Sequence, residues 1–204
     1  MDYQELGVTY TREDIILILK QNLSQKRFDH VLRVEQTALV LAEQYQIDKK
    51  IVSLTALLHD YGKERADEEY LALIAKNPKY HDLTPYGNNI WHGFLGALIV
   101  RDELKIYDER ILHAIQVHTT GSIEMNLLDK IIFIADYIEP GRDFPGVETA
   151  RKLAYSGKLD DAIIFALTQT LQFLITKKQI VYPYTIEVYN YWITKKEREE
   201  HNDK

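Results

Sequence analysis

The sequence predicts an all-α fold in a single domain. Apolar residues recur at spacings of three and four along nearly every segment, which is the period of a helix packed on one face. Capping residues precede several of these segments, and no stretch alternates as a convincing strand does. No internal repeat or low-complexity linker divides the 204 residues, so we expect one domain with its core at about 12–190 and a charged tail at 195–204.

The first half of the chain contains four expected helices. Thr11, Ser24 and Asp48 are typical helix caps, and Gly62 is expected to end the third helix. Residues 77–89 hold two prolines, a glycine and several polar side chains, which predicts a long loop of the kind that often carries function. The expected helices span residues 12–19, 25–45, 49–61 and about 64–76.

Six further helices are expected in the second half. Asp108 and Asn126 are the expected N-caps, and Gly121 and Pro140 lie where helices should end. The expected ranges are about 89–104, 109–118, 127–139, 148–155, 160–177, and a last helix from about 186 that gives way to the charged tail.

Composition argues against several classes of function. The net charge of -6 argues against a general nucleic-acid binder, although a local basic pocket for a small phosphate compound remains compatible. The absence of cysteine excludes disulfides, thiolate metal sites and cysteine nucleophiles. The acidic N-terminus lacks the order of a signal peptide, and no apolar stretch approaches the ~20 residues that cross a bilayer. We therefore expect a cytoplasmic protein without membrane contact.

Six ionisable side chains are expected on the inward faces of five helices. The clearest are His59 and Asp60, which end the apolar run 54–58, and burying both is costly unless each is paired or binds a metal. Any one of the six is more readily explained as a hydrogen-bonded core residue or cap. Together, with no evident set of buried Lys or Arg partners, they favour a metal centre that neutralises them all. The set is His30, His59, Asp60, His92, His118 and Asp136.

The other three histidines are assigned to structural or surface positions. His81 lies in the polar loop, His201 lies in the charged tail, and His113 is rotated well away from His118 around its helix. The candidate ligands are thus neutral imidazoles and carboxylates. Such ligands suit iron, manganese, cobalt, nickel or zinc, and do not by themselves choose among these metals.

Several segments carry a resemblance to a known family. His30, the His59-Asp60 pair and Asp136 follow the H…HD…D order of the HD-domain metal-dependent phosphohydrolases. The chain further resembles the bacterial YqeK family over about residues 12–190, in the segments RFDH (27–30), LLHDYGK (57–63), HTTG (118–121) and DYIEPGR (136–142). The resemblance implies one HD domain (1–204), a helical bundle with the metal site inside, that hydrolyses diadenosine tetraphosphate symmetrically to two ADP.

The resemblance also implies iron as the metal and gives the ligands their roles. The first ion is expected on four residues, His30, His59, Asp60 and Asp136. Asp60 either bridges to a second ion held by His92 and His118, or those two histidines touch substrate phosphates over a single ion. The metal-activated water is then the attacking group.

The polyphosphate substrate is strongly anionic, so a locally basic mouth is expected around the metal. Lys63, one turn after His59 if the helix continues, is assigned to catalysis together with Asp60; its plain alternative is a solvated cation at a helix end. Thr119 and Thr120 either cap a helix or lend hydroxyls to phosphate. The residues assigned to the substrate are Arg27, His30, Lys63, His92, His118, Thr119, Asp136 and Arg142.

Three alternatives stay open beside this interpretation. Another HD-type phosphohydrolase would act on nucleoside monophosphates, dNTPs or guanosine tetraphosphate. A nucleotide-sensing module would bind without hydrolysis, and a helical scaffold would carry its histidines incidentally. The partners expected are a small dinucleoside polyphosphate and the ADP product, and the oligomeric state is open. Tyr86, Tyr137 and Tyr182 either stack on a base or belong to the core.

Overall fold

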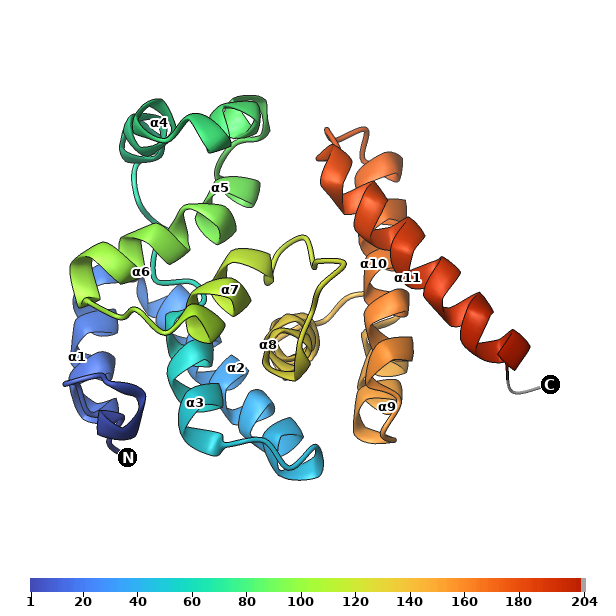
Figure 1. The fold of residues 1–204 in the computed structure, drawn as a ribbon, viewed down its shortest axis with the longest axis horizontal. Helices are drawn as coiled ribbons and strands as arrows, with labels where there is room; N and C mark the ends of the chain where they lie inside the picture. The colour runs from blue at the N-terminus through green and yellow to red at the C-terminus, as the bar shows by residue number, and fades with distance from the viewer. Residues whose placement is uncertain (203–204) are drawn as a thin grey trace.

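The structure, a computed structural model, describes residues 1–202 and is built of helices (Figure 1). Over this range no strand forms, and one isolated bridge pairs Asp2 with Thr11. The all-α prediction is therefore confirmed. Buried side chains extend from Tyr3 to Trp192, somewhat beyond the core expected at about 12–190.

The helices follow one another with short connections. Their order is η1 (Gln4–Leu6), α1 (Arg12–Asn22), α2 (Gln25–Gln44), α3 (Lys49–Leu58), α4 (Asp67–Lys76), η2 (Pro78–Tyr86), α5 (Asn88–Phe94), α6 (Gly96–Leu104), α7 (Glu109–Val117), α8 (Leu127–Ile138), α9 (Val147–Tyr155), α10 (Leu159–Thr176) and α11 (Pro183–Asn202). Most bounds agree with the expected ones to within about one residue, the usual uncertainty of a helix end, whereas α1 ends later and α4 begins later than expected.

Side-chain caps are present at all five helix starts where the sequence predicts one. In each case a side-chain oxygen accepts a hydrogen bond from a backbone N–H of the first turn, which has no partner within the helix. Thr11 and Asn126 form reciprocal capping boxes with the acidic residue three positions on. The capping residues are Thr11, Ser24, Asp48, Asp108 and Asn126.

Gly62 does not end α3, contrary to expectation. The helix ends at Leu58, and the chain continues in tighter turns in which Lys63 N donates to the carbonyl of Asp60 at 2.9 Å. Gly62 serves close packing instead. A Cβ there would lie 2.9 Å from the Tyr70 hydroxyl and 3.3 Å from Cα of Gly96. The absent side chain lets the segment after His59 pack closely beside α6.

Three other segments differ from the sequence prediction. The expected loop 77–89 forms 3-10 turns over Pro78–Tyr86, where two prolines lack the N–H donors of an α-helix. The expected helix 89–104 breaks at Leu95 into α5 and α6, with a helix-weakening glycine close to the break on either side. The last helix starts earlier, since proline is tolerated in a first turn, and carries the expected tail through residue 202. Residues 203 and 204 lie outside the described range.

Helix α8 occupies the centre of the bundle and positions the functional residues. It packs against α2, α3 and α7 on one side and against α9 and α10 on the other (Figure 1). Its side chains Ile131, Ile132 and Ile134 are fully buried. Burying an aliphatic side chain of this size contributes about 1.5–3 kcal/mol, so α8 is a principal anchor of the fold.

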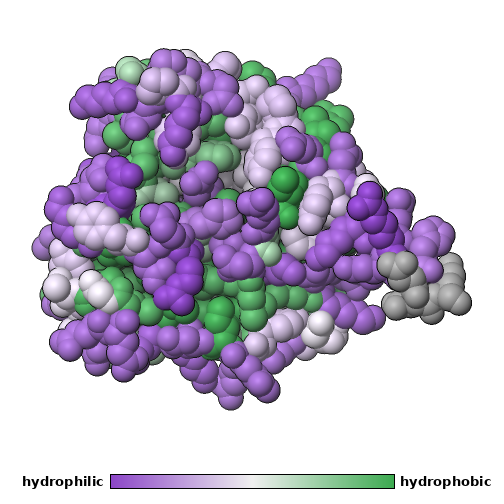
Figure 2. Space-filling model, in the orientation of Figure 1, coloured by the Kyte–Doolittle hydropathy of each residue, from purple (hydrophilic) through white to green (hydrophobic). Residues whose placement is uncertain are grey.

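Contrary to the sequence expectation, one helix, α10, is long and apolar enough to cross a membrane by length and composition alone. A single helix of this kind is weak evidence for a membrane span, and α10 packs against α8, α9 and α11, with 33% of its residues buried. Figure 2 shows one face of the molecule, on which hydrophilic residues cover most of the surface and apolar residues lie between them.

Candidate metal centre

The fold brings all six candidate ligands together in the middle of the bundle. They come from five helices or their ends, and their ligand atoms form overlapping groups of three in which every atom lies within 4.8 Å of the others. Five of the six side chains are buried, and Asp136 is partly exposed. The residues are His30 on α2, His59 and Asp60 after α3, His92 on α5, His118 after α7 and Asp136 on α8.

Asp60 lies between two pairs of histidines. Its Oδ2 atom lies 3.6 Å from Nε2 of His30 and 3.5 Å from Nε2 of His59. Its Oδ1 atom lies 3.4 Å from Nε2 of His92 and 3.7 Å from Nε2 of His118. One carboxylate therefore faces both pairs, with a separate oxygen toward each.

Asp136 lies beside the first pair. Its Oδ1 atom is 3.1 Å from Nε2 of His30 and 4.0 Å from Nε2 of His59. The same oxygen accepts a hydrogen bond of 2.5 Å from Arg142, whose Nε also donates to the main-chain carbonyl of Asp136 at 2.9 Å. The first pair thus has two carboxylates and the second pair has one.

Three of the histidines are oriented by main-chain carbonyls. A carbonyl only accepts hydrogen bonds, so each Nδ1 carries the proton and each Nε2 presents a lone pair toward the centre. Each of the three acceptors belongs to the turn before the ring. They are Ala56 for His59 (2.6 Å), Asn88 for His92 (2.7 Å) and Ile115 for His118 (2.7 Å).

His30 is oriented by a carboxylate that the sequence analysis did not single out. Its Nδ1 lies 3.1 Å from Oε1 of Glu139, which is 1% exposed and also binds Arg33 at 2.6 Å. Burial alone would raise the pKa of Glu139, but hydrogen bonds from Arg33 and the backbone N–H of Gly141 outweigh burial and lower it. The available signal was an acid directly after the apolar helix that carries Asp136.

The cluster fits a bound cation. Nε2 of His30 and Nε2 of His59 are buried without a hydrogen-bond partner, which is costly for a polar atom. Nε2 of His92 lies 3.1 Å from Nε2 of His118, so two lone pairs face one another. A divalent ion among neutral imidazoles and carboxylates satisfies all of these atoms together.

The protonation states of two histidines and of Asp60 suit metal binding as well. Burial alone would lower the pKa of His59, but Asp60 outweighs burial and raises it. Burial lowers the pKa of His92 to about 3 and that of His118 to about 4, so both rings are neutral near pH 7. Burial alone would raise the pKa of Asp60, but the surrounding histidines, His59 first, hold it well below its usual range. Neutral imidazole and ionised carboxylate are the forms that ligate metals.

Arginine partners exist for both aspartates, contrary to the sequence expectation. Arg27 Nη1 donates to Oδ2 of Asp60 at 2.7 Å, and Arg142 binds Asp136 as described above. Both arginines are partly buried. Burial alone would lower the pKa of Arg142, but Asp136 outweighs burial and raises it. The sequence assigned both arginines to substrate phosphates, and both lie beside the cluster through these contacts.

Lys63 reaches the same cluster. Its Nζ atom lies 3.2 Å from Nδ1 of His92 and 3.5 Å from Oδ1 of Asn89. Because Nδ1 of His92 already donates to a carbonyl at 2.7 Å, the ammonium is close to the ring without a strong bond to it. Burial lowers the pKa of Lys63, with further lowering by Arg27 and partial compensation by Asp60. The helix-end alternative of a solvated cation does not describe this position.

Of the two threonines after His118, one faces the cluster and one does not. Thr119 Oγ1 lies 3.2 Å from Nε2 of His118 and 3.3 Å from Nε2 of His92. Thr120 is buried and donates to the carbonyl of Gly121 at 2.9 Å. Thr119 is therefore the threonine positioned to contact a ligand of the centre.

The three tyrosines considered for base stacking all have aromatic neighbours. The ring centroid of Tyr182 lies 4.8 Å from that of Tyr86, and that of Tyr137 lies 5.0 Å from that of Phe144. Tyr182 also donates to Asp82 at 3.2 Å. These contacts give each ring a packing role.

The remaining histidines lie outside the cluster. His113 places Nδ1 2.9 Å from Oδ2 of Asp129, a fully buried residue at the start of α8. His81 and His201 are exposed. None of the three joins a group of possible ligands among the residues described.

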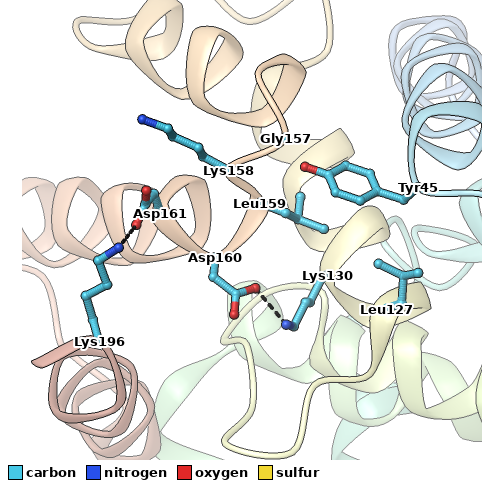
Figure 3. A pocket seen from close by; sticks show the side chains of 9 residues that line it. All are labelled: Tyr45, Leu127, Lys130, Gly157, Lys158, Leu159, Asp160, Asp161 and Lys196. Carbon is cyan, nitrogen blue, oxygen red and sulfur yellow. Dashed lines mark hydrogen bonds and ion pairs between the residues drawn. The ribbon is translucent and has the colours of Figure 1, made fainter. Parts of the chain in front are cut away.

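A cavity of about 310 Å³ lies apart from the metal centre (Figure 3). It is bordered by Lys130, Lys158 and two aspartates at the start of α10, and two of its lysine–aspartate pairs are drawn in Figure 3. Asp160 accepts from Lys130 at 2.6 Å and Asp161 binds Lys196 at 2.8 Å. None of the six candidate ligands lines this cavity.

Comparison with known proteins identifies the protein class to which this helical fold and its histidine–aspartate cluster belong. The model of the HD domain matches residues 27–141, which contain all six candidate ligands. A solved structure from Clostridium acetobutylicum, described as a predicted HD superfamily hydrolase involved in NAD metabolism, has a TM-score of 0.83 and 37% identity. The match covers 91% of this chain and 98% of that one. The chain is thus a helical protein of the HD class.

Closer relatives narrow the family. A protein of Halalkalibacterium halodurans named symmetrical bis(5'-nucleosyl)-tetraphosphatase is 43% identical, with 88% of this chain and 95% of that one covered. A protein of Bacillus subtilis with the same name is 40% identical, with 90% and 98% covered. The chain belongs to the HD-domain family and, within it, to the YqeK-type family of these relatives.

We expect protein purified without chelator to contain a divalent metal held by the cluster. His59→Ala removes one ligand and should weaken metal binding by more than about 100-fold. Substituting a residue that only hydrogen-bonds to a ligand typically costs less than this. Metal content and a titration with Mn²⁺ measure this. His81→Ala is the matched control, because His81 is exposed and lies outside the cluster. Equal metal binding by His59→Ala and the parent protein would contradict the site.

The His113–Asp129 pair should make stability depend on pH. Asp129 raises the pKa of His113, so the imidazolium contributes stability that is complete below about pH 6.5 and lost as the pH rises through the raised value. The contribution is below about 1 kcal/mol, because His113 is partly exposed. Denaturant unfolding of the parent and His113→Asn should differ more at about pH 6 than at about pH 9. A difference independent of pH would count against the pair.

Proposed function

We propose that this protein is a metal-dependent hydrolase that cleaves diadenosine tetraphosphate symmetrically to two ADP. The observation that carries the proposal is the buried cluster of four histidines around Asp60, with Lys63 and two arginines at its edge. The names of the full-length relatives supply the substrate and the symmetry of cleavage. We propose that the protein acts in the cytoplasm and that its reaction uses neither a nucleic acid nor a membrane.

The proposed ligands fall into two groups. The first ion would be held by His30, His59 and Asp136 together with Oδ2 of Asp60. Oδ1 of Asp60 points toward His92 and His118, which supports a second ion there rather than direct contact of both rings with phosphate. We propose iron for the first ion, with manganese, cobalt, nickel and zinc compatible with the same ligands.

The chemistry divides between the ion and the side chains. A bound divalent ion supplies Lewis-acid polarisation and lowers the pKa of a coordinated water from 15.7 to about 7. Asp60 and Asp136 supply the negative charge that holds the ion, and buried carbonyl-bound imidazoles keep their lone pairs directed inward. Burial of the centre strengthens each of these interactions.

The cations at the edge of the centre are proposed to bind the polyphosphate. Symmetric cleavage breaks one phosphoanhydride bond, so the attacked phosphorus takes the water oxygen and ADP leaves with the bond electrons. The leaving phosphate gains charge, and we assign the stabilisation of that charge to Lys63, Arg27 and Arg142. Thr119 can donate a hydrogen bond to a phosphate oxygen held beside His118.

Other functions are less well supported. A sensor that binds without turnover has no need for all six ligands, yet all six are present and directed inward. Hydrolysis of mononucleotides or guanosine tetraphosphate would use the same centre, and only the names of the relatives favour the dinucleotide. An incidental scaffold would leave two facing imidazole lone pairs without purpose.

The metal-loaded protein should convert diadenosine tetraphosphate to ADP as the sole nucleotide product. Asp60→Ala should lower kcat by about 10³-fold or more, since it removes the carboxylate shared by both histidine pairs, while the protein stays helical. Chromatography of the products with Mn²⁺ or Fe²⁺ tests this, with the exposed Asp102→Ala variant as control. ATP plus AMP, or cleavage of mononucleotides alone, would overturn the substrate assignment.

Lys63→Ala should reduce kcat/KM by about 10–100-fold, the usual effect of losing a charge-assisted hydrogen bond to phosphate. Metal affinity should be unchanged, because Lys63 is not a ligand. Lys79→Ala is the matched control, since Lys79 is exposed on η2 and lies over the ring of Tyr80. Full activity of Lys63→Ala, or loss of metal by this variant, would contradict the role.

A further inference from the structure

His30 is held by a charged side chain, whereas the other three histidines of the centre are held by main-chain carbonyls. We propose that Glu139 is the positioning residue of His30. It fixes the proton on Nδ1, sets the angle of the ring and increases the electron donation from Nε2 to the metal. This inference rests on the proposed metal-dependent function and deepens it.

The carboxylate of Glu139 is itself fixed from several directions. Its Oε2 atom accepts hydrogen bonds from Nε of Arg33 at 2.6 Å and from the backbone N–H of Gly141 at 2.5 Å. Its Oε1 atom lies 3.1 Å from Nδ1 of His30 and 3.4 Å from Nη2 of Arg33. One oxygen is therefore anchored and the other is directed at the imidazole.

The turn after α8 provides the room for this arrangement. Glu139 is the C-cap of the helix, and its N–H donates to Ala135 at 3.0 Å. A Cβ at Gly141 would lie 2.6 Å from Nε and Nη2 of Arg33. Glycine thus allows the guanidinium to lie against the turn and hold the carboxylate. The segment that carries Asp136 also carries the support for His30.

A carboxylate behind a ligating imidazole acts differently from a carbonyl. Its negative charge favours a proton on the near nitrogen and raises the basicity of the far nitrogen. Substitutions of such residues typically lower metal affinity by about 10–100-fold without removing any ligand. We therefore expect Glu139 to affect the ion through His30, with no direct contact.

The chain supplies a matched control for burial and charge. Glu35 lies on the same helix as His30, is 1% exposed, and accepts hydrogen bonds from Arg12 at 2.8 and 2.6 Å. It also accepts a hydrogen bond from Ser53 at 2.5 Å, and among the described residues it belongs to none of the groups of possible metal ligands. Replacing Glu35 by glutamine therefore removes a buried carboxylate–arginine pair and leaves the surroundings of the metal unchanged.

The test is a titration of metal-free protein with Co²⁺, followed by the visible absorption of the bound ion. Glu139→Ala should lower the Co²⁺ affinity by about 10–100-fold and shift the bands, and Glu139→Gln, which can still accept from Nδ1–H, should fall between. Glu35→Gln should keep the parent affinity and spectrum. The midpoint temperature of thermal unfolding should fall by a similar amount in Glu35→Gln and Glu139→Gln. Should Glu139→Ala fail to fold, Glu139→Gln carries the comparison.

Parent-like Co²⁺ affinity and spectrum in the folded Glu139 variants would overturn the inference. So would an equal loss of affinity in Glu35→Gln, because the effect would then be one of general stability. A parent protein that binds Co²⁺ with the expected dependence on Glu139, yet leaves diadenosine tetraphosphate intact with Mn²⁺ or Fe²⁺, would overturn the proposed function and support the inference. A parent protein that binds no Co²⁺ would overturn both.

Discussion

The structure depends on the burial of one carboxylate, that of Asp60, among four imidazole rings. A buried charge is tolerated only where opposite charges or hydrogen bonds compensate it, and here Arg27 donates to Asp60 at 2.7 Å. The two oxygens face different histidine pairs, so a cation on either side relieves the same cost. This constraint explains why the surrounding rings are buried and directed inward.

Several helices must end at the right place for this arrangement to form. Helices α3 and α7 stop at the residue before their histidine, so each ring turns back to a carbonyl of its own last turn. Helix α8 brings Asp136 from the centre of the bundle, and the turn after it supports His30 through Glu139. The apolar packing and the metal centre are therefore products of the same helix positions.

The sequence was sufficient for the fold class, the five side-chain caps and the six candidate ligands, because these depend on local periodicity and on unusual polar residues in apolar runs. It failed where tertiary packing decides. Gly62 was expected to end a helix and instead makes room for Tyr70, and Glu139 was overlooked because an acid at a helix end is ordinarily exposed. The pairing of Arg27 with Asp60 joins residues 33 apart, which no spacing rule reveals. The roles of the site residues, the iron assignment and the domain limits stay predictions.

The central claim is that the buried cluster is a metal centre organised around Asp60. Anomalous diffraction from crystals of the protein as purified, recorded on both sides of the absorption edge of the metal it contains, tests this most directly. We predict a peak among Nε2 of His30, Nε2 of His59 and the carboxylates of Asp60 and Asp136, with any second peak between Asp60 and the His92–His118 pair. Anomalous peaks confined to other parts of the molecule, with these side chains hydrogen-bonded only to protein and water, would contradict the account.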